Sequence, residues 1–154
     1  MQAFYEKKIV EYFLKTVRII LMTTKTNNYN TGVAAEYFIL SQLFRQDVEA
    51  YITMGNKKAV DIRVLKNDGT AISVDVKAVR GYSSLIVNNM TYSKDHVAVF
   101  VVYNNKFTDV DILPDVFVVP SMDVFNLKRK YGKELRIMKS DILPYKNKWS
   151  NITY

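Results

Sequence analysis

The chain has 154 residues, 49% hydrophobic and 24% charged, which is typical of one globular domain. It contains no cysteine and a single histidine, His96, so disulfides, thiolate metal sites and clusters of several histidines are excluded. Oxygen-ligated Mg²⁺, Mn²⁺ or Ca²⁺ is compatible with this composition. The formal net charge of +7 favours a polyanionic partner, with nucleic acid ahead of an anionic membrane.

The N-terminal 21 residues predict an accessory amphipathic helix. Lys15 and Arg18 interrupt its apolar residues, so we expect neither a signal peptide nor a membrane span, and we expect a cytoplasmic protein. The polar stretch 22–30 is predicted to be a linker. Residues 31–154 are then expected to form the functional domain.

A second helix is predicted over 31–46, with Thr31 or Asn30 as its cap. The predicted core face of this helix consists of Val33, Tyr37, Leu40, Leu43 and Phe44.

The rest of the chain alternates strands and helices, which predicts an α/β (α+β) domain around one central mixed sheet. A helix over 121–132 is expected to start at Ser121 and to end at Gly132, with the basic residues 128–130 in its last turn. Strands are predicted over 48–53, in the two halves of 60–77, and over 96–104, 116–120 and 135–138, the last as an edge strand, before a polar turn over 140–149.

The stretch 60–77 predicts a hairpin that places two aspartates opposite each other. A three-residue loop with Gly69 in the left-handed position would pair Lys66 with Thr70. Counting outward then places Asp61 opposite Asp75. A two-residue loop would instead put the aspartates on opposite faces. In the first register Lys77 shares the face of Asp75, and the other face is wholly apolar: Val60, Ile62, Val64, Ile72, Val74 and Val76.

Two opposed carboxylates repel each other and weaken a sheet unless something compensates. A divalent cation would do so, and Asp61 with Asp75 would form a two-carboxylate site for Mg²⁺. Lys77 could then orient a water or stabilise charge on a phosphate. The alternative is a surface ion-pair cluster on a solvated face.

Glu36 lies within the apolar stripe of the predicted 31–46 helix. A carboxylate that points inward is costly unless it is paired or metal-bound. Glu36 could therefore join the two aspartates and Lys77, or it could turn outward or pair with Lys57 or Lys58.

The order of these residues resembles the PD-(D/E)xK nuclease superfamily, and most of all the small Holliday-junction-resolvase-like and restriction-endonuclease-like proteins. The matching residues, between about 31 and 103, are Gly32 and Glu36 in GVAAE, Asp61 in AVDIRV, and Asp75 and Lys77 in VDVK. Val60 stands where the superfamily often has proline.

The resemblance implies a restriction-endonuclease-like core and metal-assisted hydrolysis of DNA phosphodiesters, with a homodimer because cleavage of two strands needs two sites. Asp61 and Asp75 would hold Mg²⁺, or Mn²⁺ in its place, with Glu36 as a ligand or base and Lys77 positioning the hydroxide. Phosphates or bases could be held by residues near this site in sequence: Lys57, Lys58, Arg63, Arg80, Tyr82 and Lys94. His96 is expected to be structural.

Three alternatives stay open. The chain could be a nucleic-acid-binding module with this fold and no cleavage, or a protein-assembly subunit. It could also be an unrelated α+β domain with a surface ion-pair cluster. Convergence of Glu36, Asp61 and Asp75 within metal-bridging reach is the structural check on the nuclease reading.

Overall fold

The computed structural model describes residues 2–53, 60–81 and 84–153, with the side chains of 2–7 and 17–27 left out. It divides into two compact units, Met1–Asn30 and Thr31–Tyr154. Among the described residues, no helix combines the length and the apolar character that crossing a membrane requires.

The first helix, α1, spans Gln2–Phe44. Residues 22–30 are therefore helical, and the expected break in the helix at this stretch is wrong. The physical reason is that 22–30 contain neither proline nor glycine, the two residues that end helices most strongly. Thr31 consequently does not cap a new helix.

The core-facing row of α1 in the second unit differs from the predicted one. Ala35, Ile39 and Leu43 are buried, at a spacing of four residues. Leu43 was predicted correctly, but Tyr37 and Phe44 are 58% and 54% exposed. The prediction followed the large apolar side chains, and Tyr37 and Phe44 lie on a face of the helix that the sheet does not bury.

A five-stranded mixed sheet forms the centre of the second unit, in the order β1-β2-β3-β5-β6. All pairs are antiparallel except β3 with β5, which are parallel. The predicted strands are confirmed as β1 (Ala50–Ile52), β2 (Ile62–Leu65), β3 (Ala71–Val79), β5 (His96–Val102) and β6 (Asp115–Pro120).

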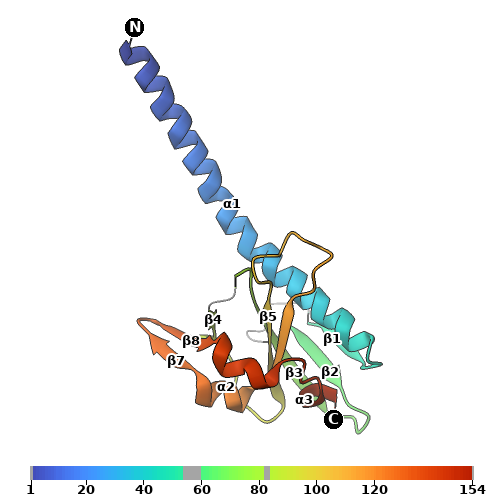
Figure 1. Cartoon of the computed structure of the whole chain (residues 1–154). Coiled ribbons are helices and arrows are strands. Elements are labelled where there is room, and N and C mark those ends of the chain that lie inside the picture. The colour runs from blue at the N-terminus through green and yellow to red at the C-terminus, as the bar shows by residue number, and fades with distance from the viewer. Residues whose placement is uncertain (1, 54–59, 82–83, 154) are drawn as a thin grey trace. The chain divides into compact units, whose positions relative to one another are not determined.

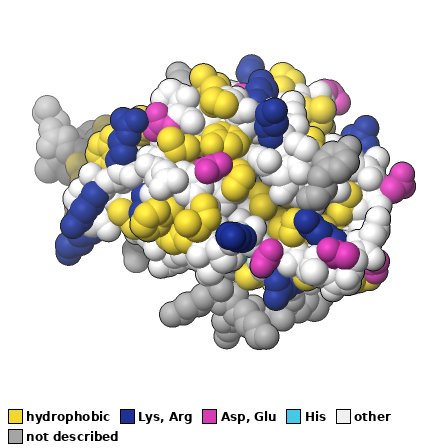
Figure 2. Space-filling model, turned by 90° about the horizontal axis from the view of Figure 1, so that it is seen from below, with side chains coloured by type: hydrophobic (Ala, Val, Ile, Leu, Met, Phe, Trp, Pro, Cys, Tyr) yellow, Lys and Arg dark blue, Asp and Glu magenta, His cyan; other side chains and the backbone are white. Residues whose placement is uncertain are grey.

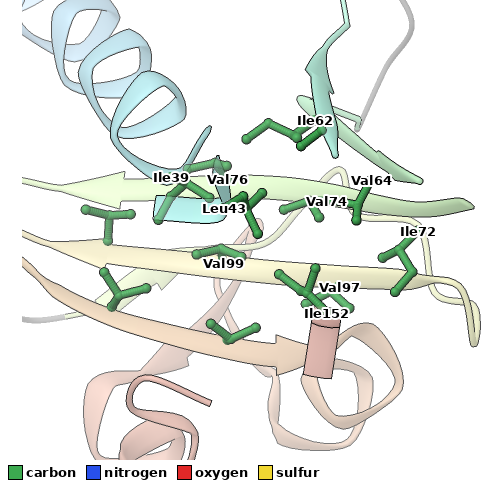
Figure 3. Close-up of a cluster of buried hydrophobic side chains, with 14 of the residues drawn as sticks. Ile39, Leu43, Ile62, Val64, Ile72, Val74, Val76, Val97, Val99 and Ile152 are labelled. Atoms are coloured by element: carbon green, nitrogen blue, oxygen red, sulfur yellow. The ribbon is translucent and has the colours of Figure 1, made fainter. Parts of the chain in front are cut away.

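The two faces of this sheet bury separate hydrophobic clusters. One face packs against α1 through Ile39 and Leu43, and against Ile152 near the C-terminus (Figure 3). The predicted apolar face of the β2–β3 hairpin belongs to this cluster, which confirms it for Ile62, Val64, Ile72, Val74 and Val76. The other face packs Ala98, Phe100 and Phe117 against a second layer.

The second layer contains a three-stranded antiparallel sheet in the order β4-β8-β7 (Figure 1). Leu85 of β4 and Ile137 of β8 are fully buried against the central sheet. The strand over 135–138 is therefore central in its sheet, and its prediction as an edge strand is wrong. The strands of this sheet are β4 (Ser84–Ile86), β7 (Arg129–Tyr131) and β8 (Glu134–Met138).

The helix after β6 is shorter than predicted. This helix, α2, spans Ser121–Leu127, and residues 129–131 form β7. Ser121 does not cap it, because its hydroxyl donates to the Ser93 carbonyl at 2.8 Å and accepts from the Ser93 N–H at 2.9 Å. The chain ends with η1 (Lys139–Tyr145) and α3 (Ser150–Thr153) where a polar turn was expected over 140–149.

Candidate active site

The β2–β3 hairpin has the register that the sequence predicts. Lys66 N–H donates to the Thr70 carbonyl at 2.8 Å, and Gly69 has a φ of +80°. Ile62 pairs with Val74 and Leu65 with Ala71, so this register extends as far as Ile62, the residue after Asp61. The three-residue loop is confirmed, and the alternative that separates the aspartates is wrong.

Asp61 lies where the regular β2–β3 pairing ends. Its N–H donates to the Val74 carbonyl at 2.9 Å. Its carboxylate Oδ2 accepts from the Val76 N–H at 2.6 Å. By the alternation of an antiparallel ladder, Val76 N–H would otherwise face the backbone carbonyl of Val60. The Asp61 side chain thus replaces a backbone acceptor, which holds its carboxylate against β3.

Asp75 is a fully buried carboxylate, with 0% of its surface exposed. Its Oδ1 accepts from Lys77 Nζ at 2.6 Å. Its Oδ2 has no hydrogen-bond partner among the described residues, although nearly all buried polar atoms in proteins have one. The carboxylate of Asp75 pairs with Lys77 and is buried, so it does not lie on a solvated face.

The pKa values of the site carboxyls are raised by this environment. Burial, with repulsion from Asp61, raises the pKa of Asp75 to about 6 against the opposing effect of Lys77. Burial also raises the pKa of Glu36, with a further increase from Asp61 and a decrease from Lys77. These shifts show that Asp61 acts electrostatically on both other carboxyls.

Glu36 is half-buried on α1, at the margin of the row that faces the core. Its Oε1 lies 4.0 Å from the position that a Cβ at Gly32 would occupy, so the carboxylate folds along its own helix. Among the residues that the structure describes, no three acidic or histidine side chains are grouped so that they could hold a metal ion. Glu36, Asp61 and Asp75 thus do not form a three-carboxylate group, so the expected convergence of all three within metal-bridging reach is wrong.

Next to the carboxylates, a polar row crosses three strands. Arg63 of β2 and His96 of β5 both pair with Ser73 of β3, and Arg63 Nη1 donates to the Ser73 hydroxyl. Because β3 residues alternate between faces, Ser73 lies on the same face as Asp75 and Lys77.

His96 belongs to this polar row, which the sequence did not indicate. It is 2% exposed, and its Nε2 has no hydrogen-bond partner among the described residues. Burial lowers its pKa, as does the positive charge of Lys77. Only the strand pairing reveals this neighbour, because its partner Ser73 lies far from His96 in the sequence.

The other predicted nucleic-acid contacts are dispersed. Arg80 donates through Nε to the Thr31 hydroxyl at 2.8 Å and lies 3.9 Å from the centre of the Phe107 ring. These contacts fix Arg80 between α1 and the loop after β5. Lys94 is exposed. The remaining candidates lie outside the described residues: Lys57, Lys58 and Tyr82.

A hollow of about 950 Å³ lies at the other end of the hairpin. It is bounded by the residues that follow α1, the β2–β3 loop and α3, and Asp47, Glu49 and Asp68 give it acidic side chains. Asp61 and Asp75 do not line it. The volume of this hollow therefore does not bear on the chemistry of the carboxylates.

Comparison with known proteins supports the fold. The chain is similar to a bacterial homing endonuclease, I-Ssp6803I, at a TM-score of 0.50 and 17% identity, covering 78% of this chain and 86% of that one. It is also similar to the Holliday junction resolvase Hjc of Archaeoglobus fulgidus, at a TM-score of 0.48 and 14% identity, covering 75% and 93%. No protein-family profile and no curated protein sequence matches the chain. At these identities the likeness concerns the fold alone, and the fold is restriction-endonuclease-like, as the resemblance in the sequence implied.

Proposed function

We propose that this protein is a metal-dependent endonuclease that hydrolyses DNA phosphodiester bonds, in branched or duplex DNA. The observation that carries the proposal is the buried carboxylate of Asp75, which lies beside Asp61 and Lys77 and has one oxygen without a partner in the part of the chain that the structure describes. A buried charge that is not fully paired costs stability, so a fold retains it where chemistry requires it. The restriction-endonuclease-like fold supports the same reading.

The donor set fits a hard divalent cation such as Mg²⁺, with Mn²⁺ as a substitute. Mg²⁺ is usually held by one or two carboxylates together with waters and phosphate oxygens, so Asp61 and Asp75 are sufficient protein ligands. The unpartnered Asp75 Oδ2 is an oxygen that a cation would satisfy. When bound, the ion would polarise the scissile phosphate and lower the pKa of a coordinated water.

The other residues act around these two ligands. Lys77, whose side chain is 28% exposed, holds Asp75 Oδ1 and presents its ammonium group to an incoming phosphate or hydroxide. The pKa of Glu36 is raised toward neutral pH, which suits a base, and Glu36 acts through water. The Val76 N–H holds the Asp61 carboxylate in place.

A cleavage panel tests the proposal. Four-way junction, duplex and single-stranded DNA are incubated with the protein and Mn²⁺ or Mg²⁺. We expect metal-dependent nicks that fall at least about 100-fold in Asp75→Asn and in Lys77→Ala, because each removes electrostatic stabilisation of the transition state. Arg45→Ala, a change of an exposed residue outside the site, is the control. Binding without metal-dependent cleavage would assign the chain to the non-cleaving module instead.

The metal site has a test that needs no activity. His96 is the only histidine of the chain, so its imidazole signals in an NMR spectrum are assigned without further work. Because Asp61 and Lys77 act electrostatically on His96, paramagnetic Mn²⁺ bound at the site should broaden these signals. Asp75→Asn should abolish the broadening. Sharp His96 signals at stoichiometric Mn²⁺ in the unchanged protein would contradict the site.

We also propose a homodimer, because cutting both strands of a duplex needs two copies of this site. Light scattering coupled to size exclusion measures the mass directly. A particle of twice 17.9 kDa is expected, and a monomer that cuts both strands would overturn this part of the proposal.

A further inference from the structure

The basic run after α2 forms a β-hairpin and not the end of a helix. We call residues 128–136, KRKYGKELR, the basic arm: five of its nine residues are basic and one is acidic. Tyr131 pairs with Glu134 across a two-residue turn in which Gly132 has a φ of +59°. The residues of β7 are all exposed.

The base of the basic arm is firmly attached to the domain. Lys128 Nζ lies 4.1 Å from the centre of the Tyr92 ring and 4.0 Å from that of Phe125. Leu135 N–H donates to Asn88 Oδ1 at 2.5 Å, and Ile137, just beyond the arm, is fully buried. The hairpin therefore extends from a fixed base in the second layer (Figure 1).

Three of the five basic side chains in the arm have partners within the protein. Lys128 lies over the two rings, Arg129 pairs with Asp141 at 3.0 Å, and Arg136 pairs with Glu134. Among the residues that the structure describes, Lys130 and Lys133 contact no acidic side chain and make no hydrogen bond through their ammonium groups. Two unpaired cations therefore flank Tyr131, which is 48% exposed, at the tip.

The basic arm lies in the layer that covers the site-bearing face of the central sheet. Asp75 pairs with Ala98 and Lys77 with Phe100, and both partners pack in the cluster that contains Ile137 of β8. Figure 2 shows one face of the molecule, on which Lys and Arg side chains are interspersed with acidic and hydrophobic ones.

We propose that the basic arm is a nucleic-acid-binding element, in which Lys130 and Lys133 hold backbone phosphates and Tyr131 contacts a sugar or base. A two-stranded ribbon of this kind fits a groove of duplex DNA, and free ammonium groups are the usual phosphate contacts. Charged edge strands also prevent unwanted pairing between molecules, but that role requires neither an exposed tyrosine nor a lysine in the turn. The inference rests on the proposed function, because it takes DNA as the ligand.

The test is a binding measurement that does not depend on cleavage. A fluorescein-labelled 30-base-pair duplex is titrated in EDTA with the full-length protein, Lys130→Ala/Lys133→Ala, or the matched control Lys66→Ala/Lys148→Ala. Both double variants remove two positive charges, and neither changes a residue of the candidate active site. We expect the arm variant to bind about 10-fold more weakly, with the slope of log K against log salt reduced by about 2, since each phosphate contact contributes about one.

The outcomes separate the arm from the active site. Equal losses in the two double variants, or no loss in the arm variant, would overturn the role of the arm while leaving a metal-dependent nuclease intact. Failure of the unchanged protein to bind the duplex would overturn the arm as a DNA-binding element. If cleavage were also absent, the proposed function would fall with it. Circular dichroism of each variant verifies that the fold is unchanged.

Discussion

The β2–β3 and β7–β8 hairpins have a similar plan and opposite placement of charge. Each is antiparallel, and each turns at a glycine with positive φ, Gly69 or Gly132. The first buries a carboxylate completely, whereas all residues of β7 are exposed. Buried charge reduces stability and exposed charge hardly affects it. Changes in the first hairpin should therefore alter the free energy of unfolding. Changes in the second should be detected only by measurements of binding.

The largest expected difference between the hairpins concerns their apolar side chains. Ile62 is fully buried in β2, so Ile62→Ala should lower the free energy of unfolding by about 2–5 kcal/mol through lost burial and a residual cavity. Tyr131→Ala in β7 should change the free energy of unfolding by less than about 0.5 kcal/mol. Urea denaturation of both variants measures this, and equal losses would contradict the assignment of Tyr131 to an exposed tip.

A second prediction sharpens the contrast in charge. The pKa of Asp75 is raised from 3.8 to about 6 by burial, so the folded protein binds more protons than the unfolded chain between these two pH values. The contribution of Asp75 to stability should therefore fall as pH rises through that window and stay low above it. Asp75→Asn remains neutral and should be more stable than the unchanged protein at pH 7.5, by on the order of 1–3 kcal/mol.

Thermal denaturation of both proteins at pH 4.0 and pH 7.5 measures this effect, and the difference should be small at the lower pH. A variant less stable than the unchanged protein at pH 7.5 would show that the Lys77 pair outweighs the burial of the carboxylate.

Alanine substitution should have the same effect on stability at the two glycine turns. Nothing lies within 4 Å of a Cβ added at Gly69 or Gly132, so alanine meets only the strain of a positive φ. Each substitution should cost about 1 kcal/mol. Because the loop geometry is retained, Gly69→Ala should still show Mn²⁺ broadening of the His96 signals. Loss of that broadening would show that alanine shifts the register.

The smallest expected effect belongs to the surface ion pair of the second hairpin. The Arg129 side chain, 58% exposed, pairs with Asp141 at 3.0 Å. Exposed pairs contribute about 0–1 kcal/mol and are screened by salt. Arg129→Ala should therefore change stability by less than about 1 kcal/mol, and less again in 0.5 M NaCl as compared by urea denaturation. A larger, salt-independent loss would indicate that Arg129 packs as well as pairs.

The sequence predicted the site hairpin well because its turn is chemically distinctive. Asn67, Asp68 and Gly69 define the loop, and the loop determines which residues face each other. Strict alternation of side chains then placed Asp75 and Lys77 on one face. The resemblance to PD-(D/E)xK nucleases added the fold, which the similarity to the homing endonuclease confirms.

The failures arose where the decisive contacts are distant in the chain. Residues 128–130 follow a helix and were extended into it, whereas pairing with β8 makes 129–131 a strand. Strand β4 of the second layer was also not predicted. The neighbours of His96, Ser73 and Lys77, lie on another strand and were not foreseen either. Local patterns contain no information on these pairings.

The bond from Val76 N–H to the Asp61 carboxylate has a consequence for mutational scanning. Asp61 completes the hydrogen bonding of the sheet, so its replacement by alanine leaves a backbone N–H of a buried strand residue without its acceptor. Position 61 should therefore score as intolerant in an abundance screen that does not monitor nuclease activity. Position 75 should tolerate asparagine in the same screen and fail only when function is selected. Selection for abundance would then preserve the carboxylate of Asp61, whereas only selection for function would preserve that of Asp75.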